Sequence, residues 1–238
     1  MNVKTLSMMA GLGGALLLAA PSQASFTGIS AEQIFAGNTG VAIPEGFVTL
    51  RIYANFDNAM DRGIGVVGSP SNPLLWTAAG GTFFDSDAGT ANDQAPSDSL
   101  LGLPGFESLN WDSWFAIGTD SAETGGGLVV APGTEMAPFL NGATSWDGGP
   151  GGSTNVAWTR TPDDDLTLAG DDLQVLLAQI TVAVDNIDAL LVEGTMGLLI
   201  QEDGVNSEVA GSFSFIPAPG ALALLGLAGL AGTRRRRA

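Results

Sequence analysis

The most regular pattern in the chain is FVTLRIYANF, residues 47–56, in which apolar and polar side chains alternate. A period of two places one set of side chains on each face, which is typical of a strand buried on one side. RGIGVVG, residues 62–68, follows a turn-like DNAMD segment. The two runs therefore predict a hairpin. The apolar face of the first run holds Val48, Leu50, Ile52, Ala54 and Phe56.

The most apolar internal segment is DLQVLLAQITVAV, residues 172–184. If the segment is a strand, both of its faces are apolar in its first half, which predicts a central strand buried on both sides. A helix over residues 173–179 is the alternative, and the following Thr-Val-Ala-Val favours a strand. We expect one face of this strand to hold Leu176, Ala178, Ile180, Val182 and Val184.

Four shorter runs also predict strands: residues 108–119, 155–160, 194–202 and 208–216. The last two form a C-terminal meander around the turn DGVNS. One short helix is expected over residues 30–35, where Ser30 caps and Gln33 stands three residues later.

Residues 69–107 and 120–154 show no periodicity and are rich in Gly, Pro, Ser, Asp and Asn. Long glycine-rich loops between short strands are typical of sandwiches. We therefore predict an all-β fold: a single antiparallel β-sandwich over residues 25–216, of jelly-roll or immunoglobulin-like type. A signal peptide precedes it, and a hydrophobic helix follows it.

Residues 1–24 predict export. Lys4 provides a positive start, residues 6–20 are apolar, and small residues stand at Ser22 and Ala24. This order is typical of a secretory signal peptide cut between Ala24 and Ser25. An uncleaved anchor is the alternative, although Pro21 interrupts the apolar run early.

The last 22 residues, 217–238, combine a proline motif, an apolar run over residues 221–232 and an arginine cluster. Twelve helical residues span about 18 Å, less than the ~30 Å hydrocarbon core of a bilayer. The positive-inside rule would hold the arginines in the cytoplasm and leave the acidic body outside. The motif and cluster comprise Pro217, Ala218, Pro219, Arg234, Arg235, Arg236 and Arg237.

This arrangement resembles the PEP-CTERM protein-sorting domain of exported bacterial proteins. Ala218 stands where that family usually has Glu. The resemblance implies cleavage by an exosortase-type membrane protease, transient anchoring in the inner membrane and delivery to the cell surface or the extracellular matrix. It also implies an association with exopolysaccharide or biofilm. A plain C-terminal membrane anchor is the alternative reading of the same residues.

Between the two ends, three basic residues stand against 25 acidic ones, a formal charge of −22. Such a surface repels nucleic acid. The chain has no Cys and no His, which removes thiolate chemistry and the commonest general base. A phosphate-binding P-loop is excluded because the one lysine is Lys4. We therefore expect no enzyme and no required cofactor. A hydrolase that uses two carboxylates is the enzymatic alternative.

Three local features suggest binding. Asp85, Asp87 and Asp93 in DSDAGTAND partly match the Asp-x-Asp spacing of a calcium loop, with a solvated acidic turn as the alternative. A second acidic cluster, residues 161–165 with Asp171 and Asp172, can be read in the same two ways. Trp146 lies in the flexible-looking SWDGGPGG, where an exposed ring would stack on a sugar. A secreted carbohydrate-binding module is thus the alternative function.

Overall fold

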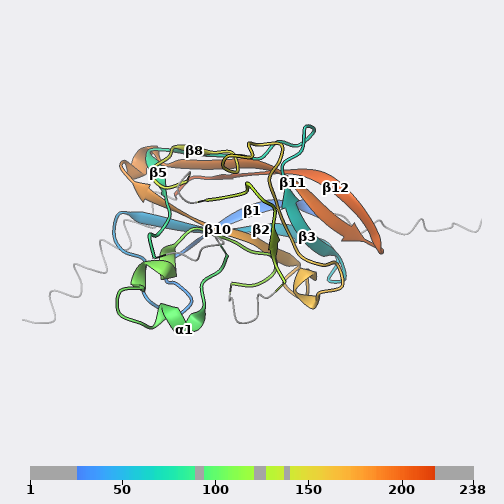
Figure 1. Ribbon diagram of the computed structural model, residues 1–238, viewed down its shortest axis with the longest axis horizontal. Helices are drawn as coiled ribbons and strands as arrows, with labels where there is room; N and C mark the ends of the chain where they lie inside the picture. Colours follow the sequence, from blue (N-terminus) through green and yellow to red (C-terminus); the bar gives the residue numbers. More distant parts are fainter. Residues whose placement is uncertain (1–25, 89–93, 121–126, 137–139, 218–238) are drawn as a thin grey trace, which may run out of the picture.

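The computed structural model describes residues 26–88, 94–120, 127–136 and 140–217, which fold into two antiparallel sheets packed face to face (Figure 1). The prediction of an all-β sandwich is confirmed, and one sheet curls into a half-barrel. The first sheet runs in the order β1 (Phe26–Ile34), β2 (Phe47–Phe56), β10 (Gln174–Val184) and β5 (Gly81–Phe84), and β6 (Trp114–Phe115) also pairs with β10.

The second sheet is built around β11, the longest strand. Its order is β7 (Val129–Val130), β9 (Ala157–Thr159), β3 (Arg62–Val67), β11 (Leu191–Glu202), β4 (Leu75–Ala79) and β8 (Ser145–Trp146). On its other side, residues 192–202 of β11 pair with the whole of β12 (Val205–Phe215). Short helices join the strands: α1 (Asp98–Leu101), η1 (Glu107–Trp111), η2 (Asp165–Thr167) and η3 (Ile187–Ala189).

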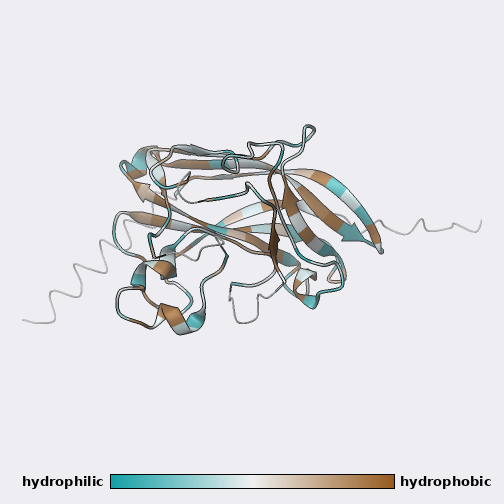
Figure 2. Cartoon of the chain, viewed as in Figure 1, coloured by the Kyte–Doolittle hydropathy of each residue, from teal (hydrophilic) through white to brown (hydrophobic). Residues whose placement is uncertain are grey.

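The core fills the space between the sheets. The predicted face of β2 is buried throughout, and along the strands of the second sheet apolar bands alternate with polar ones (Figure 2). Five aromatic rings fill the middle of this core, with contacts between neighbouring centroids of 4.4–6.4 Å. They are Trp76, Phe115, Trp146, Trp158 and Phe213.

The C-terminal hairpin is confirmed. β11 and β12 are joined by the two-residue turn Asp203–Gly204, in which both residues have positive φ (49° and 78°). Asp-Gly is a preferred pair for a type I′ turn, since this turn requires positive φ at both positions. β10, however, lies in the opposite sheet, so it is not part of this meander.

The predicted hairpin over residues 47–68 is wrong. β2 belongs to the first sheet and β3 to the second, where β3 pairs with β9 and β11. Residues 57–61 therefore cross from one sheet to the other. β2 and β3 each carry an apolar face. Because the two strands lie in opposite sheets, both apolar faces are buried in the core between the sheets.

The predicted helix over residues 30–35 is also wrong, because residues 26–34 form β1. Ser30 does not cap a helix; its hydroxyl donates to Asn55 Oδ1 at 3.3 Å. β1 pairs with β2 along nearly its full length, and its Ile29 packs over Gly211 of β12, where a Cβ would overlap the Ile29 side chain. These contacts outweigh the local capping pattern.

β10 is central, as predicted, but its face assignment changes at one point. The register with β2 shifts between Leu176 and Ala178, which is a β-bulge. Leu176 consequently leaves the main core and packs with Trp114, Ala95 and Ala116 on the outer side of the first sheet. The segment with α1 and η1 covers that side (Figure 1). Residues 108–119 are thus mostly a helical turn and loop, with β6 as their only described strand.

Candidate functional site

The outer face of the second sheet carries a polar strip where β4, β11 and β12 run side by side. Glu193 of β11 lies opposite Thr77 of β4 and Ser214 of β12. Two residues further along β11, Thr195 lies opposite Leu75 of β4 and Ser212 of β12. Because side chains alternate along a strand, these six residues face the same way. They combine four hydroxyls with one carboxylate.

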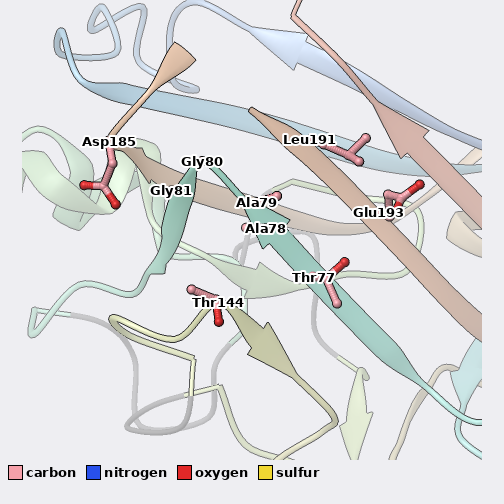
Figure 3. A pocket seen from close by; sticks show the side chains of 9 residues that line it. All are labelled: Thr77, Ala78, Ala79, Gly80, Gly81, Thr144, Asp185, Leu191 and Glu193. Atoms are coloured by element: carbon pink, nitrogen blue, oxygen red, sulfur yellow. The ribbon is translucent and has the colours of Figure 1, made fainter. Parts of the chain in front are cut away.

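Two adjoining hollows lie on this strip and share Thr77 and Glu193. The larger, about 570 Å³, is lined by Ile29, Leu75, Thr77, Glu193, Gly194, Thr195, Ser212, Phe213 and Ser214. The smaller, about 430 Å³, is lined by Thr77, Ala78, Ala79, Gly80, Gly81, Thr144, Asp185, Leu191 and Glu193 (Figure 3). Together they form a groove, which we call the outer groove.

The smaller hollow exists because the chain turns tightly between β4 and β5. Gly80 has φ of 75°, and a Cβ there would lie 2.7 Å from the Ala189 backbone, so only glycine fits. Asp185 and Glu193 are both exposed and lie at opposite ends of this hollow (Figure 3). The Ser214 hydroxyl donates to Glu193 at 3.4 Å. The Thr195 hydroxyl donates to the Pro73 carbonyl at 3.2 Å. Exposed hydroxyls and carboxylates can accept further hydrogen bonds from a polar ligand.

The prediction that Trp146 is exposed is wrong. Its exposed fraction is 2 %, and its indole N–H donates to the Glu135 carbonyl at 2.9 Å. Residues 145–146 form β8, which pairs with β4 and places Trp146 against Trp76. Trp146 is therefore a core residue and has no surface for a sugar ring.

The three predicted calcium ligands are not brought together by the described residues. Asp85 is buried just after β5, Asp87 is exposed, and Asp93 lies outside the described residues. A residue that sequence analysis missed holds this loop: the Asp112 carboxylate accepts the Ser86 amide at 2.6 Å. Within residues 26–88, 94–120, 127–136 and 140–217 no group of three acidic residues is placed to hold a metal ion. Calcium binding at residues 85–93 stays a prediction.

In the second acidic cluster, Asp164 is a structural residue. Its carboxylate accepts from the guanidinium of Arg160 at 2.7 Å, and Arg160 is only 3 % exposed. The Leu166 amide donates to the same carboxylate at 3.0 Å. These hydrogen bonds, with Arg160 first, hold the pKa of Asp164 below its ordinary value.

A third acidic cluster, which the sequence did not reveal, lies where β2, β3 and the β11–β12 hairpin meet. We call it the acidic corner; it comprises Asp57, Asp61, Glu202 and Asp203. Asp61 is 1 % exposed, and its buried Oδ2 has no hydrogen-bond partner among the described residues. Burial, followed by the nearby charges of the other three, raises the pKa of Asp61. Asp57 and Asp61 are distant in sequence from Glu202 and Asp203, and the crossing of residues 57–61 between the sheets brings the two pairs together.

Most of the predicted processing residues lie outside the described part: Ala24, Ser25, Ala218, Pro219 and Arg234 to Arg237. Pro217 is described and follows Ile216, which is 68 % exposed. None of the helices in the described residues is both long and apolar enough to span a bilayer. No model of a known protein family matches the chain, and no curated protein matches it either.

Proposed function

We propose that this chain is an exported, non-enzymatic protein of the cell surface or extracellular matrix, cut by signal peptidase at its start and by an exosortase-type protease near its end. One observation carries the proposal: the two predicted processing points bracket the sandwich. β1 begins at Phe26, directly after Ser25, and β12 ends at Phe215, two residues before Pro217. Cleavage at both points would leave every strand of both sheets intact.

The end of β12 also suits a protease. Ile216 is largely exposed, and no strand pairing involves residues 216–217. A protease needs an extended, accessible stretch of backbone, and proline-bearing segments outside a sheet supply one. Pro217, the first residue of the motif, therefore follows an exposed residue just beyond the last strand, a position that suits access by a membrane enzyme.

The outer groove supports a binding role better than a hydrolytic one. A two-carboxylate hydrolase needs its acid and its second carboxylate on either side of one bond, about 5–9.5 Å apart. Asp185 and Glu193 lie at opposite ends of an open hollow, and both are exposed to solvent (Figure 3), whereas the general acid of such a pair usually lies in a sheltered environment. The hydroxyls that line the outer groove are suited to contact with a hydroxyl-rich polymer.

Mass spectrometry of the protein recovered from the cell surface and from the medium tests the proposal. We expect a chain that starts at Ser25 and ends close to Pro217. A chain that starts at Met1, or that keeps all residues to Ala238 in every fraction, would contradict it.

The second candidate, a carbohydrate-binding module, now rests on the outer groove instead of Trp146. Glu193→Gln combined with Thr195→Val would remove two polar groups from the middle of the strip. The matched control is Glu45→Gln, an exposed glutamate before β2. On an array of acidic and neutral polysaccharides, saturable binding that is lost in the double variant and kept in the control supports the module. If the parent chain binds none of the polysaccharides, the carbohydrate-binding function is rejected.

A further inference from the structure

One row of cross-strand neighbours runs across four strands on the outer face of the second sheet. Thr77 of β4 lies opposite Ser145 of β8 and Glu193 of β11, and Glu193 in turn lies opposite Ser214 of β12. Neighbouring strands lie about 4.7–4.9 Å apart, so the row spans roughly 14 Å. We call these four residues the polar row. It presents three hydroxyls and one carboxylate at regular intervals along the outer groove.

Apolar side chains border the polar row on both sides. Leu191 and Ala79 lie opposite each other, each two residues from the row, and Leu75, which is 44 % exposed, stands two residues from it in the other direction. Ligand sites in proteins combine apolar surface with a few placed polar groups. A pyranose ring has the same two aspects, with C–H groups on its faces and hydroxyls on its rim. A sugar ring over the row would therefore meet both kinds of surface at once.

The direction and spacing of the row suit a chain of sugars. The row crosses the strands, and the distance between neighbouring strands is close to the length of one pyranose unit in an extended polysaccharide. Successive side chains of the row can thus meet successive sugars. The two hollows, about 570 and 430 Å³, lie side by side along this line and share Thr77 and Glu193. The groove therefore offers room for about three sugar units.

The groove carries negative charge that the described residues do not offset. Glu193 and Asp185 are exposed, and the three arginines of the described part line neither hollow. Arg51 and Arg160 instead form salt bridges with aspartates outside the groove. The Glu193 carboxylate accepts from the Ser214 hydroxyl at 3.4 Å, and its two oxygens can accept further hydrogen bonds.

This charge discriminates among sugars. A ligand that covers Glu193 removes water from its carboxylate, which is unfavourable unless the ligand supplies a donor or a positive charge. A uronic acid would bring a second carboxylate and be repelled. A neutral sugar offers hydroxyl donors alone. An ammonium group forms a charge-assisted hydrogen bond, which is about twice as strong as a neutral one. A sugar unit with a free amino group supplies both the ammonium and the hydroxyls.

We propose that the outer groove binds a polysaccharide whose sugar units carry free amino groups. Glu193 and Asp185 hold the ammonium groups of the polymer, and the hydroxyls of the polar row bond to its sugar hydroxyls. The ligand stays chemically unchanged, since no bond is made or broken. This inference rests on the carbohydrate-binding function proposed above and names its ligand class.

Isothermal titration calorimetry of the full chain in mild detergent tests the ligand class. Three oligosaccharides of equal length are compared: glucosamine with free amines, N-acetylglucosamine with the same linkage, and galacturonate. At about pH 5.5 carboxylates of ordinary pKa are ionised and the amines are largely protonated. We expect saturable binding of the glucosamine oligomer, binding of the N-acetylated oligomer that is about fivefold weaker or more, and none of the galacturonate oligomer.

Charge-removing variants locate the site. Glu193→Gln and Asp185→Asn should each weaken binding of the glucosamine oligomer about fivefold and reduce its advantage over the N-acetylated oligomer. The matched controls are Glu45→Gln and Asp188→Asn, which remove the same charge from exposed positions that line neither hollow. Both controls should bind as the parent does. If the controls weaken binding as much as the groove variants, binding follows net charge and the inference is overturned.

The hydroxyls separate a sugar site from a surface for any basic chain. Thr77→Val keeps the shape of the side chain and removes a hydroxyl from the middle of the polar row. It should weaken binding of the glucosamine oligomer about fivefold and leave binding of a polylysine peptide unchanged. Polylysine that binds as tightly as the glucosamine oligomer, with Thr77→Val affecting neither, would overturn the inference. Melting curves equal to that of the parent show that each variant is folded.

The same titrations separate this inference from the functions on which it rests. If the N-acetylated or galacturonate oligomer binds as tightly as the glucosamine oligomer, the ligand class is wrong and the carbohydrate-binding function stands. If none of the three binds, both are rejected. Export and processing are judged separately, from the termini of the protein recovered from cells.

Discussion

Trp146 and Trp76 lie directly opposite each other on β8 and β4, with their ring centroids 4.7 Å apart. This pair fills the centre of the sandwich at a place where the sequence suggested only a flexible loop. Trp158 and Phe115 complete the packing, stacked on each other at 4.4 Å. A two-residue strand thus anchors a long glycine-rich segment through one large side chain.

Trp146→Ala should lower the free energy of unfolding by about 3–5 kcal/mol, the usual cost of removing a buried tryptophan. Trp146→Phe keeps most of the ring volume and should cost less, with part of its loss due to the hydrogen bond to Glu135. Urea unfolding measures both. A Trp146→Ala chain as stable as the parent would contradict the buried placement.

Asp164→Asn should lower the free energy of unfolding by about 2–3 kcal/mol at pH 7, because it removes the carboxylate charge that lies 2.7 Å from the buried Arg160 guanidinium. Asn can still accept from the Leu166 amide, so the change tests the charge. The pKa of Asp164 is depressed in the folded protein. Its stabilisation is therefore present above the ordinary value of about 3.9 and is lost as the pH falls through the folded value.

Urea unfolding between pH 7 and pH 3 measures this pH dependence. The difference in free energy of unfolding between the parent and Asp164→Asn should become smaller in acid. Asp163→Asn is the matched control, since Asp163 is exposed and stands next to Asp164. It should change stability by less than about 0.5 kcal/mol. An equal loss in both variants would show that the Arg160 pair is not the cause.

Asp61→Asn should raise the free energy of unfolding by about 1–2 kcal/mol at pH 7, because a buried carboxylate oxygen without a hydrogen-bond partner among the described residues is costly. The pKa of Asp61 is raised by folding. The folded protein thus binds a proton at Asp61 more readily than the unfolded chain does, and the destabilisation caused by the ionised carboxylate disappears as the pH falls toward 3.9. The stability gained by Asp61→Asn should therefore be smaller in acid than at pH 7. Asp188→Asn, an exposed residue in η3, is the control and should show no such gain.

Sequence periodicity predicted β2, β10, β11 and β12, but among the strand pairings it predicted correctly only the β11–β12 hairpin. β2 was found from its alternation, and the β11–β12 hairpin from its Asp-Gly turn. β4 was missed because its alternation is inverted: Leu75 is 44 % exposed, whereas its buried positions hold Trp76 and Ala78. Hydropathy in a five-residue strand cannot show which side meets the core.

The candidate sites depend still more on tertiary structure. The acidic corner joins residues 57–61 to residues 202–203, and nothing local in either segment indicates the other. The outer groove follows from strand order, since Thr77, Glu193 and Ser214 become neighbours only when β4 and β12 flank β11. Likewise, the bulge that moves Leu176 to the outer side is defined by pairing with β2.

Calcium at residues 85–93 should raise the melting temperature by mass action, since a ligand bound only to the folded state stabilises it. Thermal unfolding with millimolar calcium and with a chelator measures this. Asp87→Asn should reduce the effect and leave the core intact, because Asp87 is exposed. Identical curves for the parent chain in calcium and chelator would remove calcium from this loop.

The two changes in the C-terminal tail should have opposite effects on localisation. Twelve apolar residues make a weak anchor, and positive charge fixes its orientation more than its depth. Replacing Arg234, Arg235, Arg236 and Arg237 with serine should therefore release uncut protein into the medium. Replacing Pro217 and Pro219 with alanine should instead hold uncut protein in the membrane fraction, extractable only with detergent. Immunoblots of medium, surface and membrane fractions separate these outcomes, and Glu45→Gln should be processed as the parent is. If both tail variants are cut and released like the parent, the tail is not a sorting signal, and export rests on residues 1–24 alone.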